Sequence, residues 1–137
     1  MMRLVTSVLF VCTLLAANAI NAQNLGGSPE GKAMKNPVPA TEKSIAAGGQ
    51  TYQKMCAFCH GKEGLGDGKM APKGTTPANL VDDKWDRGET DGEIFLVLRD
   101  GAGPKFQMKG LKGKYSDTEL WNVVNYVRSL SARGKGN

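Results

Sequence analysis

The chain has 137 residues, of which 40% are hydrophobic, and it carries a formal net charge of +5 with a pI of about 9.2. This length suits one domain with a small core, and such a domain is often stabilised by a bound cofactor or a crosslink. The positive charge favours acidic partners or surfaces. It makes no case for nucleic-acid binding, because the sequence has no basic helix with interleaved aromatic residues.

The first 22 residues have the pattern of a secretory signal peptide. A short basic start is followed by an apolar run over residues 4–17, and small residues then lead up to Ala22. We expect cleavage after Ala22 or Ala19 and localisation in the periplasm. The apolar run is shorter than the roughly 20 residues that span a bilayer. We therefore expect no stable membrane insertion after cleavage, and a retained membrane anchor is the alternative.

Residues 23–43 and the C-terminal end lack the pattern of a folded segment. Residues 23–43 are rich in Gly, Pro, Lys and Asn and show no apolar period, which predicts a flexible leader. Residues 132–137 are expected to form a disordered tail. The remaining residues, 44–131, are predicted to form one domain.

Three helices are predicted in or beside this domain. The first runs from about residue 41 to residue 59, with Thr41 or Ser44 as its N-terminal cap. The second begins with the capping box TDGE at residues 90–93, and the third with the capping box SDTE at residues 116–119. Loops rich in Gly and Pro connect them, and no clear alternating strand is seen. The sequence therefore predicts a small all-α domain whose long loops wrap around something.

The segment CAFCH at residues 56–60 holds two cysteines and the only histidine of the chain. The third cysteine, Cys12, belongs to the predicted signal peptide. A structural zinc site would need four ligands, and the chain offers no second cluster. A thioredoxin-like redox pair would need a βαβ pattern that is absent, whereas C-x-x-C-H is the attachment signature of c-type haem. The motif therefore predicts one covalently bound haem c.

Helical geometry explains the spacing of this motif. Cys56 and Cys59 are three positions apart, so they project from one face of a helical turn and can both reach the vinyl groups along one edge of a porphyrin. His60 lies one position further round and can place a ring nitrogen on the iron. The haem would also supply a large apolar element to the core of a small domain.

The opposite face of the iron needs a second ligand. The chain has no other histidine, and methionine is the usual alternative in cytochromes c. Met34 lies in the predicted leader, and Met55 adjoins Cys56 and cannot easily reach the opposite face. Met108 lies in a Gly-rich segment between the second and third helices that can fold across the ring. We predict Met108 as the ligand, with Met70 as the alternative.

In combination, these residues resemble a class I monohaem cytochrome c. The resemblance is carried by Gly48 and Tyr52, the CAFCHG motif, PANL at residues 77–80, Met108, and the pattern from Leu120 to Val127. It covers about residues 44–131 and is closest to small bacterial electron-carrier cytochromes and to the cytochrome subunits or domains of oxidases and dehydrogenases. It implies an all-α cytochrome c fold, in which three main helices and long loops are wrapped around one covalently attached haem.

The resemblance also implies how the first and last helices meet. In this family the two helices cross at right angles, with a glycine and an aromatic residue of one against an aromatic residue of the other. Gly48 and Tyr52 would then meet Val123 and Tyr126.

The loop before the second helix has implied roles as well. A proline carbonyl would accept the hydrogen bond of the His60 ring nitrogen that faces away from the iron. Pro77 is the candidate and Pro72 the second choice. Leu80 would pack on the haem, and Trp85 would cover or hydrogen-bond a propionate, or else be a half-buried core aromatic.

The implied function is one-electron transfer between redox partners outside the cytoplasmic membrane, not enzymatic catalysis. Two alternatives stay open: an electron-entry subunit of a larger oxidoreductase complex, and a haem enzyme or gas sensor with an open iron position. Lysines near the motif and near Met108 would form a docking rim for an acidic redox partner, or else an ordinary solubilising surface. These lysines are Lys62, Lys69, Lys73, Lys105, Lys109, Lys112 and Lys114.

Overall fold

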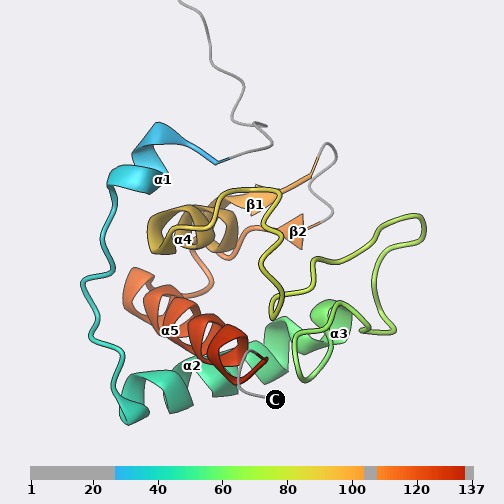
Figure 1. Ribbon diagram of the computed structural model, residues 1–137, viewed down its shortest axis with the longest axis horizontal. Helices are drawn as coiled ribbons and strands as arrows, with labels where there is room; N and C mark the ends of the chain where they lie inside the picture. The colour runs from blue at the N-terminus through green and yellow to red at the C-terminus, as the bar shows by residue number, and fades with distance from the viewer. Residues whose placement is uncertain (1–26, 104–107, 135–137) are drawn as a thin grey trace, which may run out of the picture.

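The computed structural model of the protein describes residues 27–103 and 108–134 (Figure 1). Within these ranges the chain is mostly helical, as predicted. Its elements are α1 (Pro29–Ala33), α2 (Glu42–Met55), α3 (Ala57–His60), α4 (Asp91–Asp100), β1 (Gly101–Ala102), β2 (Met108–Lys109) and α5 (Asp117–Gly134). The predicted signal peptide, its cleavage sites and Lys105 lie outside the described residues. None of the helices in the described ranges is both long enough and apolar enough to cross a membrane.

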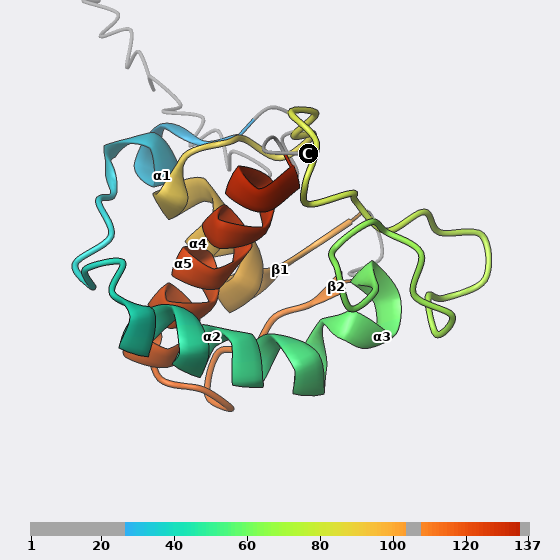
Figure 2. The same ribbon diagram turned by 60° about the horizontal axis from the view of Figure 1, so that its bottom comes forward.

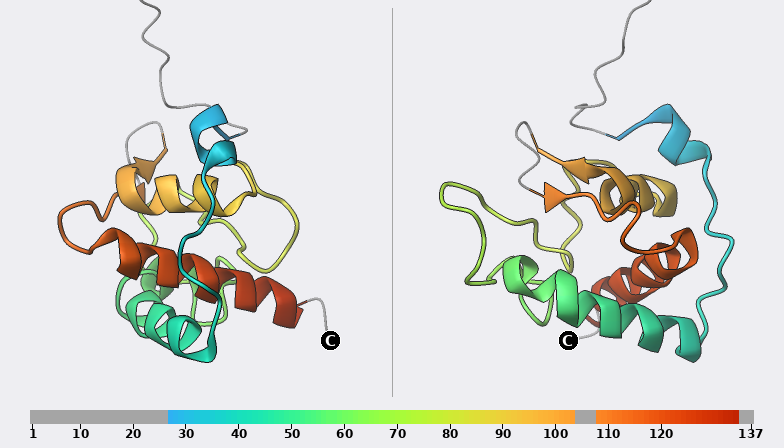
Figure 3. Two further views of the ribbon diagram at one scale, coloured as in Figure 1. Left: turned by 90° about the vertical axis from the view of Figure 1, so that its left-hand side faces the viewer. Right: turned by 180° about the vertical axis from the view of Figure 1, so that it is seen from behind.

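The helices form a stack in which α5 lies between α2 and α4, and α1 lies on the outer side of α4 (Figures 1 and 3). The long loop that follows α3 leaves this stack and passes to one side (Figure 2). Phe95 of α4 stacks on Trp121 of α5, with ring centroids 4.1 Å apart. Five apolar side chains of α5 are buried in the core: Leu120, Val123, Val124, Val127 and Leu130.

The closest helix contact is the crossing of α2 and α5 (Figure 2). A Cβ atom on Gly48 would overlap the backbone carbonyl of Asn122 and come within 2.9 Å of the Val123 nitrogen. The rings of Tyr52 and Tyr126 meet beside it, with centroids 5.0 Å apart. The predicted contacts between these helices are therefore present, and the missing side chain of Gly48 is what lets the backbones approach so closely.

Local sequence signals set most of the helix ends. Both predicted capping boxes, at residues 90–93 and 116–119, form with reciprocal hydrogen bonds. Thr41 and Ser44 make a third box together, so the two candidate caps act as a pair. The predicted single helix over residues 41–59 is wrong in one respect: it divides at Cys56 into α2 and α3. A new turn starts there, since the amides of Cys59 and His60 both bond to the Cys56 carbonyl.

The prediction of a flexible leader over residues 23–43 is wrong from residue 27 onward. Ser28 caps the short helix α1, and its backbone N–H donates to Glu93 of α4 at 3.1 Å. The Asn36 side chain donates to Asn125 of α5 at 2.8 Å. These anchors are polar and their partners are distant in sequence, so no apolar period reveals them. At the other end, α5 continues to Gly134, into the predicted disordered tail.

Candidate functional site

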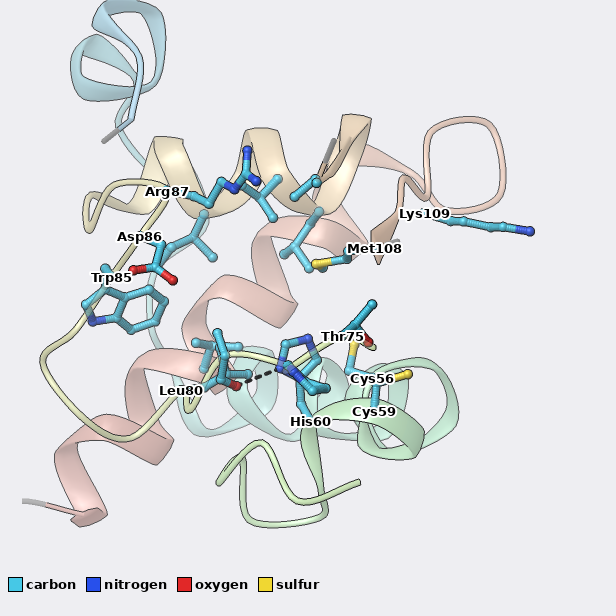
Figure 4. Close-up of a pocket in the computed structure, with 18 of the residues that line it drawn as sticks. Cys56, Cys59, His60, Thr75, Leu80, Trp85, Asp86, Arg87, Met108 and Lys109 are labelled. Carbon is cyan, nitrogen blue, oxygen red and sulfur yellow. Dashed lines mark hydrogen bonds between the residues drawn. The ribbon is translucent and has the colours of Figure 1, made fainter. Parts of the chain in front are cut away.

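A cavity of about 570 Å³ opens between α3 on one side and α4 with β2 on the other (Figure 4). Its walls are mainly apolar and include core side chains of α4 and α5 such as Leu98 and Val127. This size and lining are typical of a site for an organic cofactor. All of the predicted site residues line it: Cys56, Cys59, His60, Pro77, Leu80, Trp85 and Met108.

The two cysteines lie together at one end of the cavity, and both are free thiols (Figure 4). Cys56 is buried, and burial, with a smaller contribution from Cys59, raises the pKa of its thiol to about 12. Among the described residues, no group of three or more His, Cys, Asp or Glu side chains could hold a metal ion, so the pair suits a role in covalent attachment better than one in metal binding.

The chain after the motif returns along α3 and fixes it. The amides of Gly66, Gly68 and Met70 donate to the carbonyls of His60, Cys59 and Phe58 at 2.8, 3.0 and 2.9 Å, respectively. A Cβ atom on Gly68 would overlap the backbone of Cys59, so only a glycine allows this close return. The carbonyls at the end of a short helix are thereby satisfied, and the motif is held on a rigid backbone.

The Tyr52 side chain ties this segment to the helix crossing. Its hydroxyl donates to the Gly61 carbonyl at 2.8 Å, and the side chain is completely buried. Burial is the main reason that its pKa is raised above the ordinary value. Tyr52 thus connects the crossing of α2 and α5 to the residue that follows His60.

His60 is oriented by a backbone carbonyl, but the predicted acceptor is wrong. Its Nδ1 lies 2.9 Å from the carbonyl oxygen of Ala78, not of Pro77 (dashed line in Figure 4). Because a carbonyl can only accept, Nδ1 carries the proton, and the lone pair of Nε2 is left to bind a metal. The acceptor thus lies one residue after the predicted Pro77, but it is a loop backbone carbonyl, as predicted.

Register explains the shift from Pro77 to Ala78. The amide of Leu80 donates to the Gly64 carbonyl at 2.6 Å, which fixes the loop against the turn after the motif. The Pro77 carbonyl then faces Gly66, where a Cβ atom would come within 2.6 Å of it. With the loop in this position, the Ala78 carbonyl is the one that reaches the His60 ring.

The second choice, Pro72, is also wrong as the acceptor for His60. Its carbonyl accepts from both the amide and the hydroxyl of Thr75, at 3.0 and 2.6 Å. The Pro72 carbonyl is therefore occupied by hydrogen bonds within its own turn.

Met108 enters the cavity from the side opposite His60 (Figure 4). It lies on β2, paired with Ala102 of β1 directly after α4. The residues that follow β2 bond to the end of α4, with the amide of Leu111 on the Leu98 carbonyl at 2.9 Å. Gly101 allows the pairing, since a Cβ atom there would come within 2.6 Å of the Met108 carbonyl. The Gly-rich segment thus holds Met108 over the cavity.

The other methionines are less well placed. Met70 is 68% exposed and does not line the cavity. Met55 lines it from the same side as Cys56. Met34 packs against Gly92 of α4, away from the cavity lining.

Leu80 and Trp85 line the cavity on a loop that α5 anchors. The Ser131 hydroxyl donates to the Leu80 carbonyl at 2.7 Å. The guanidinium of Arg128 lies 5.8 Å from the centre of the Trp85 ring and donates to Asp91 at 2.7 Å. Trp85 is half-buried and lies at the end of the cavity away from the cysteines (Figure 4).

Comparison with known proteins supports the same reading of this cavity. Residues 43–127, more than half of the chain, match the family described as cytochrome c oxidase, cbb3-type, subunit III. The chain belongs to this family of cytochromes c. The family supports covalent haem c as the cofactor, and the two cysteines of the C-x-x-C-H motif are present as free thiols.

Individual relatives agree on the fold. The chain is 28% identical over 131 residues to the cytochrome c subunit of the quinone-dependent alcohol dehydrogenase of Gluconobacter oxydans, covering 90% of this chain but 27% of that protein. A chain of the Kuenenia stuttgartiensis reducing HAO-like protein complex is 29% identical, with a TM-score of 0.62 over 71% of this chain and 49% of that one. Cytochrome c6 of the diatom Phaeodactylum tricornutum is 26% identical, with a TM-score of 0.51 over 66% of this chain and 97% of that one. The cytochrome c thus spans about a quarter of the length of its curated relative.

The residues around the cavity fit a haem. Two thiols share one end, an imidazole is oriented by a hydrogen bond at its Nδ1, a thioether enters from the opposite side, and the walls are mainly apolar. Sequence reasoning missed Ala78, because a backbone carbonyl leaves no signal in the side chains. It also missed Asp86 and Arg87, which line the end beside Trp85 and which the charged run KWDR could have suggested.

Proposed function

We propose that this cytochrome c carries single electrons by means of a haem c attached to Cys56 and Cys59 and ligated by His60 and Met108. The observation that carries the proposal is the placement of His60 and Met108 on opposite sides of one apolar cavity (Figure 4). When bound, the haem supplies the one-electron couple, and a methionine ligand raises its potential. His60 and Met108 would together hold the iron and leave it no position for a substrate, which suits a carrier rather than an enzyme.

The protein's own residues hold the site in one geometry. The Ala78 carbonyl fixes the tautomer and the orientation of His60 and raises its basicity as a ligand. The β1–β2 pair keeps the Met108 thioether over the cavity. Leu80 and Trp85 line the cavity walls, where they would exclude water, and Trp85 would lie beside the propionates of a bound haem. A site that changes little between oxidation states suits electron transfer.

The partner would be a redox protein. The chain would meet it either as a subunit of a larger complex or as a free shuttle. The Gluconobacter oxydans relative is a subunit of a dehydrogenase, which favours an electron-entry subunit of a larger complex. A free shuttle between redox partners is the main proposal. Lysines along the loop after the motif and near Met108 would receive an acidic partner surface.

We also propose that the protein works outside the cytoplasmic membrane. Residues 1–22 would direct export to the periplasm and be removed after Ala22 or Ala19. The folded domain would then begin near residue 27, where α1 packs on α4, rather than at residue 44.

The ferric absorption spectrum of the haem-loaded protein tests the ligand assignment. Wild-type protein should be low-spin and show a methionine–iron charge-transfer band. Met108→Ala should lose this band and become high-spin, whereas Met70→Ala, the matched control, should keep it. A wild-type spectrum without the band, or its loss in Met70→Ala alone, would overturn the assignment.

A further inference from the structure

The buried carboxylate of Glu93 joins two parts of the chain that the haem site does not otherwise connect. Glu93 is 2% exposed and lies in the first turn of α4. One of its oxygens accepts from the Ser28 amide at 3.1 Å, and the other accepts from the amide and the hydroxyl of Thr90 at 3.0 and 2.9 Å. Glu93 therefore binds the N-terminal segment and the end of the pocket loop at the same time.

Three glycines make room for this carboxylate. A Cβ atom on Gly27 or Gly88 would overlap its oxygens, and one on Gly31 would come within 2.6 Å of its side chain. Gly27 and Gly31 belong to the N-terminal segment, whereas Gly88 lines the cavity. Gly88 also has φ of 91°, a left-handed conformation that a residue with a side chain rarely adopts. The carboxylate is thus buried against the backbone of three glycines, unlike the exposed side chain of an ordinary helix cap.

The turn held by Glu93 forms the far end of the cavity. Trp85, Asp86 and Arg87 precede Gly88 and line the cavity away from the cysteines (Figure 4). A haem carries its vinyl groups and its propionates on opposite edges, so attachment at Cys56 and Cys59 would direct the propionates to this end. The N-terminal segment lies outside residues 43–127, which match the family.

We propose that Glu93 is a positioning residue for the propionate end of the haem pocket, and that the N-terminal segment over residues 27–33 braces this end through it. The inference rests on the proposed haem binding. Glu93 touches no cofactor; it fixes the turn that carries Trp85 and Arg87. If the brace is released, water reaches this end of the pocket, and a more polar environment favours the ferric state over the ferrous state. The reduction potential then falls.

The test uses substitutions that keep the charge, because removal of a carboxylate would change the potential by electrostatics alone. Glu93→Asp shortens the side chain by one methylene and breaks its contact with the Ser28 amide. Glu119→Asp is the matched control: Glu119 makes the same capping box with Ser116, on α5, and does not line the cavity. Both variants should lower the thermal midpoint, but only Glu93→Asp should lower the reduction potential and alter the Soret circular dichroism.

A second variant keeps the proposal falsifiable if Glu93→Asp does not fold. Gly31→Ala displaces the segment while leaving the carboxylate in place, and it should also lower the potential. If the folded variants keep the wild-type potential and lose only stability, Glu93 is a structural cap and the proposal is wrong. Covalent haem content and the methionine–iron band are read in the same samples. If the wild-type protein lacks covalent haem or the methionine–iron band, the proposed function is refuted instead.

Discussion

The α3 side of the pocket and the loop side, residues 72–91, are held by different kinds of contact. On the α3 side, three successive carbonyls of the motif bond to amides of the returning chain, and Tyr52 bonds the next one. On the loop side, apart from the bond between the Leu80 amide and the Gly64 carbonyl, side chains of α5 and α4 hold the backbone at separate points. Ser131 binds the Leu80 carbonyl, Arg128 binds the Glu89 carbonyl, and Glu93 binds Thr90.

This difference shows which properties each side can set. A continuous backbone network resists change, so the α3 side provides a fixed platform for covalent attachment and for His60. Single side-chain anchors can be altered one at a time, so the loop side is where polarity and water access can vary. The comparison predicts that changes on the α3 side abolish the site or the fold, whereas changes on the loop side adjust it.

The largest effect is expected from the attachment cysteines. Replacing both Cys56 and Cys59 by alanine should abolish covalent haem, because no other free thiol is present among the described residues. Each single variant should keep one bond, since each thiol reaches its own vinyl group. Haem staining on a denaturing gel, with intact mass, measures the outcome. Covalent haem in the double variant would contradict the assignment.

Next in size is the change Gly48→Ala at the helix crossing. The added methyl group would meet the backbone of Asn122, which cannot move aside as a side chain can. We expect a loss of about 2–3 kcal/mol in the free energy of unfolding, despite the better helix propensity of alanine. Gly49→Ala is the matched control, because its methyl group would meet only the Tyr126 ring at 2.9 Å. Equal losses in the two variants would disprove this account of the crossing.

A smaller effect is expected from acid on the loop side. Burial acts to raise the pKa of Glu93, but hydrogen bonds from Thr90 and Ser28, with the charge of Lys32, outweigh it and leave the pKa lowered. A lowered pKa stabilises the fold above the unfolded value of about 4.3, and this contribution is lost as the pH falls through the folded value.

Denaturant unfolding at a series of pH values measures this contribution. Glu93→Gln should be less stable than the wild type by about 1–2 kcal/mol at neutral pH, because it weakens a buried cap. The difference should shrink as the pH falls through the lowered pKa of the wild-type carboxylate, because the carboxylate then becomes protonated. A difference that stays constant down to the lowest pH would mean that Glu93 does not carry this acid sensitivity.

Signals that act over a few residues made much of the fold predictable. The capping boxes at residues 90–93 and 116–119 and the apolar stripe of α5 each depend on neighbouring residues. The CAFCH motif likewise needs only a helical turn to bring its thiols together. Contacts between Gly48 and α5 came from the family resemblance, because spacing alone does not say which backbone passes a glycine.

The remaining features depend on contacts between distant segments. The choice of the Ala78 carbonyl over that of Pro77 depends on how the loop lies against the turn after the motif, where Leu80 bonds to Gly64. The ordered N-terminal segment depends on Glu93 and Asn125, more than 60 positions away. Such polar contacts leave no periodic pattern in the sequence. A segment rich in Gly and Pro therefore predicts flexibility even where such contacts hold it in place.

The most direct test of the central claim is the binding of carbon monoxide to the reduced, haem-loaded protein. If His60 and Met108 close both axial positions, the spectrum should not change on addition of carbon monoxide at neutral pH. Met108→Ala should bind it, which shows that the thioether is what closes the site. Stoichiometric binding to the wild-type protein would contradict the account and indicate an open iron position suited to ligand binding or catalysis.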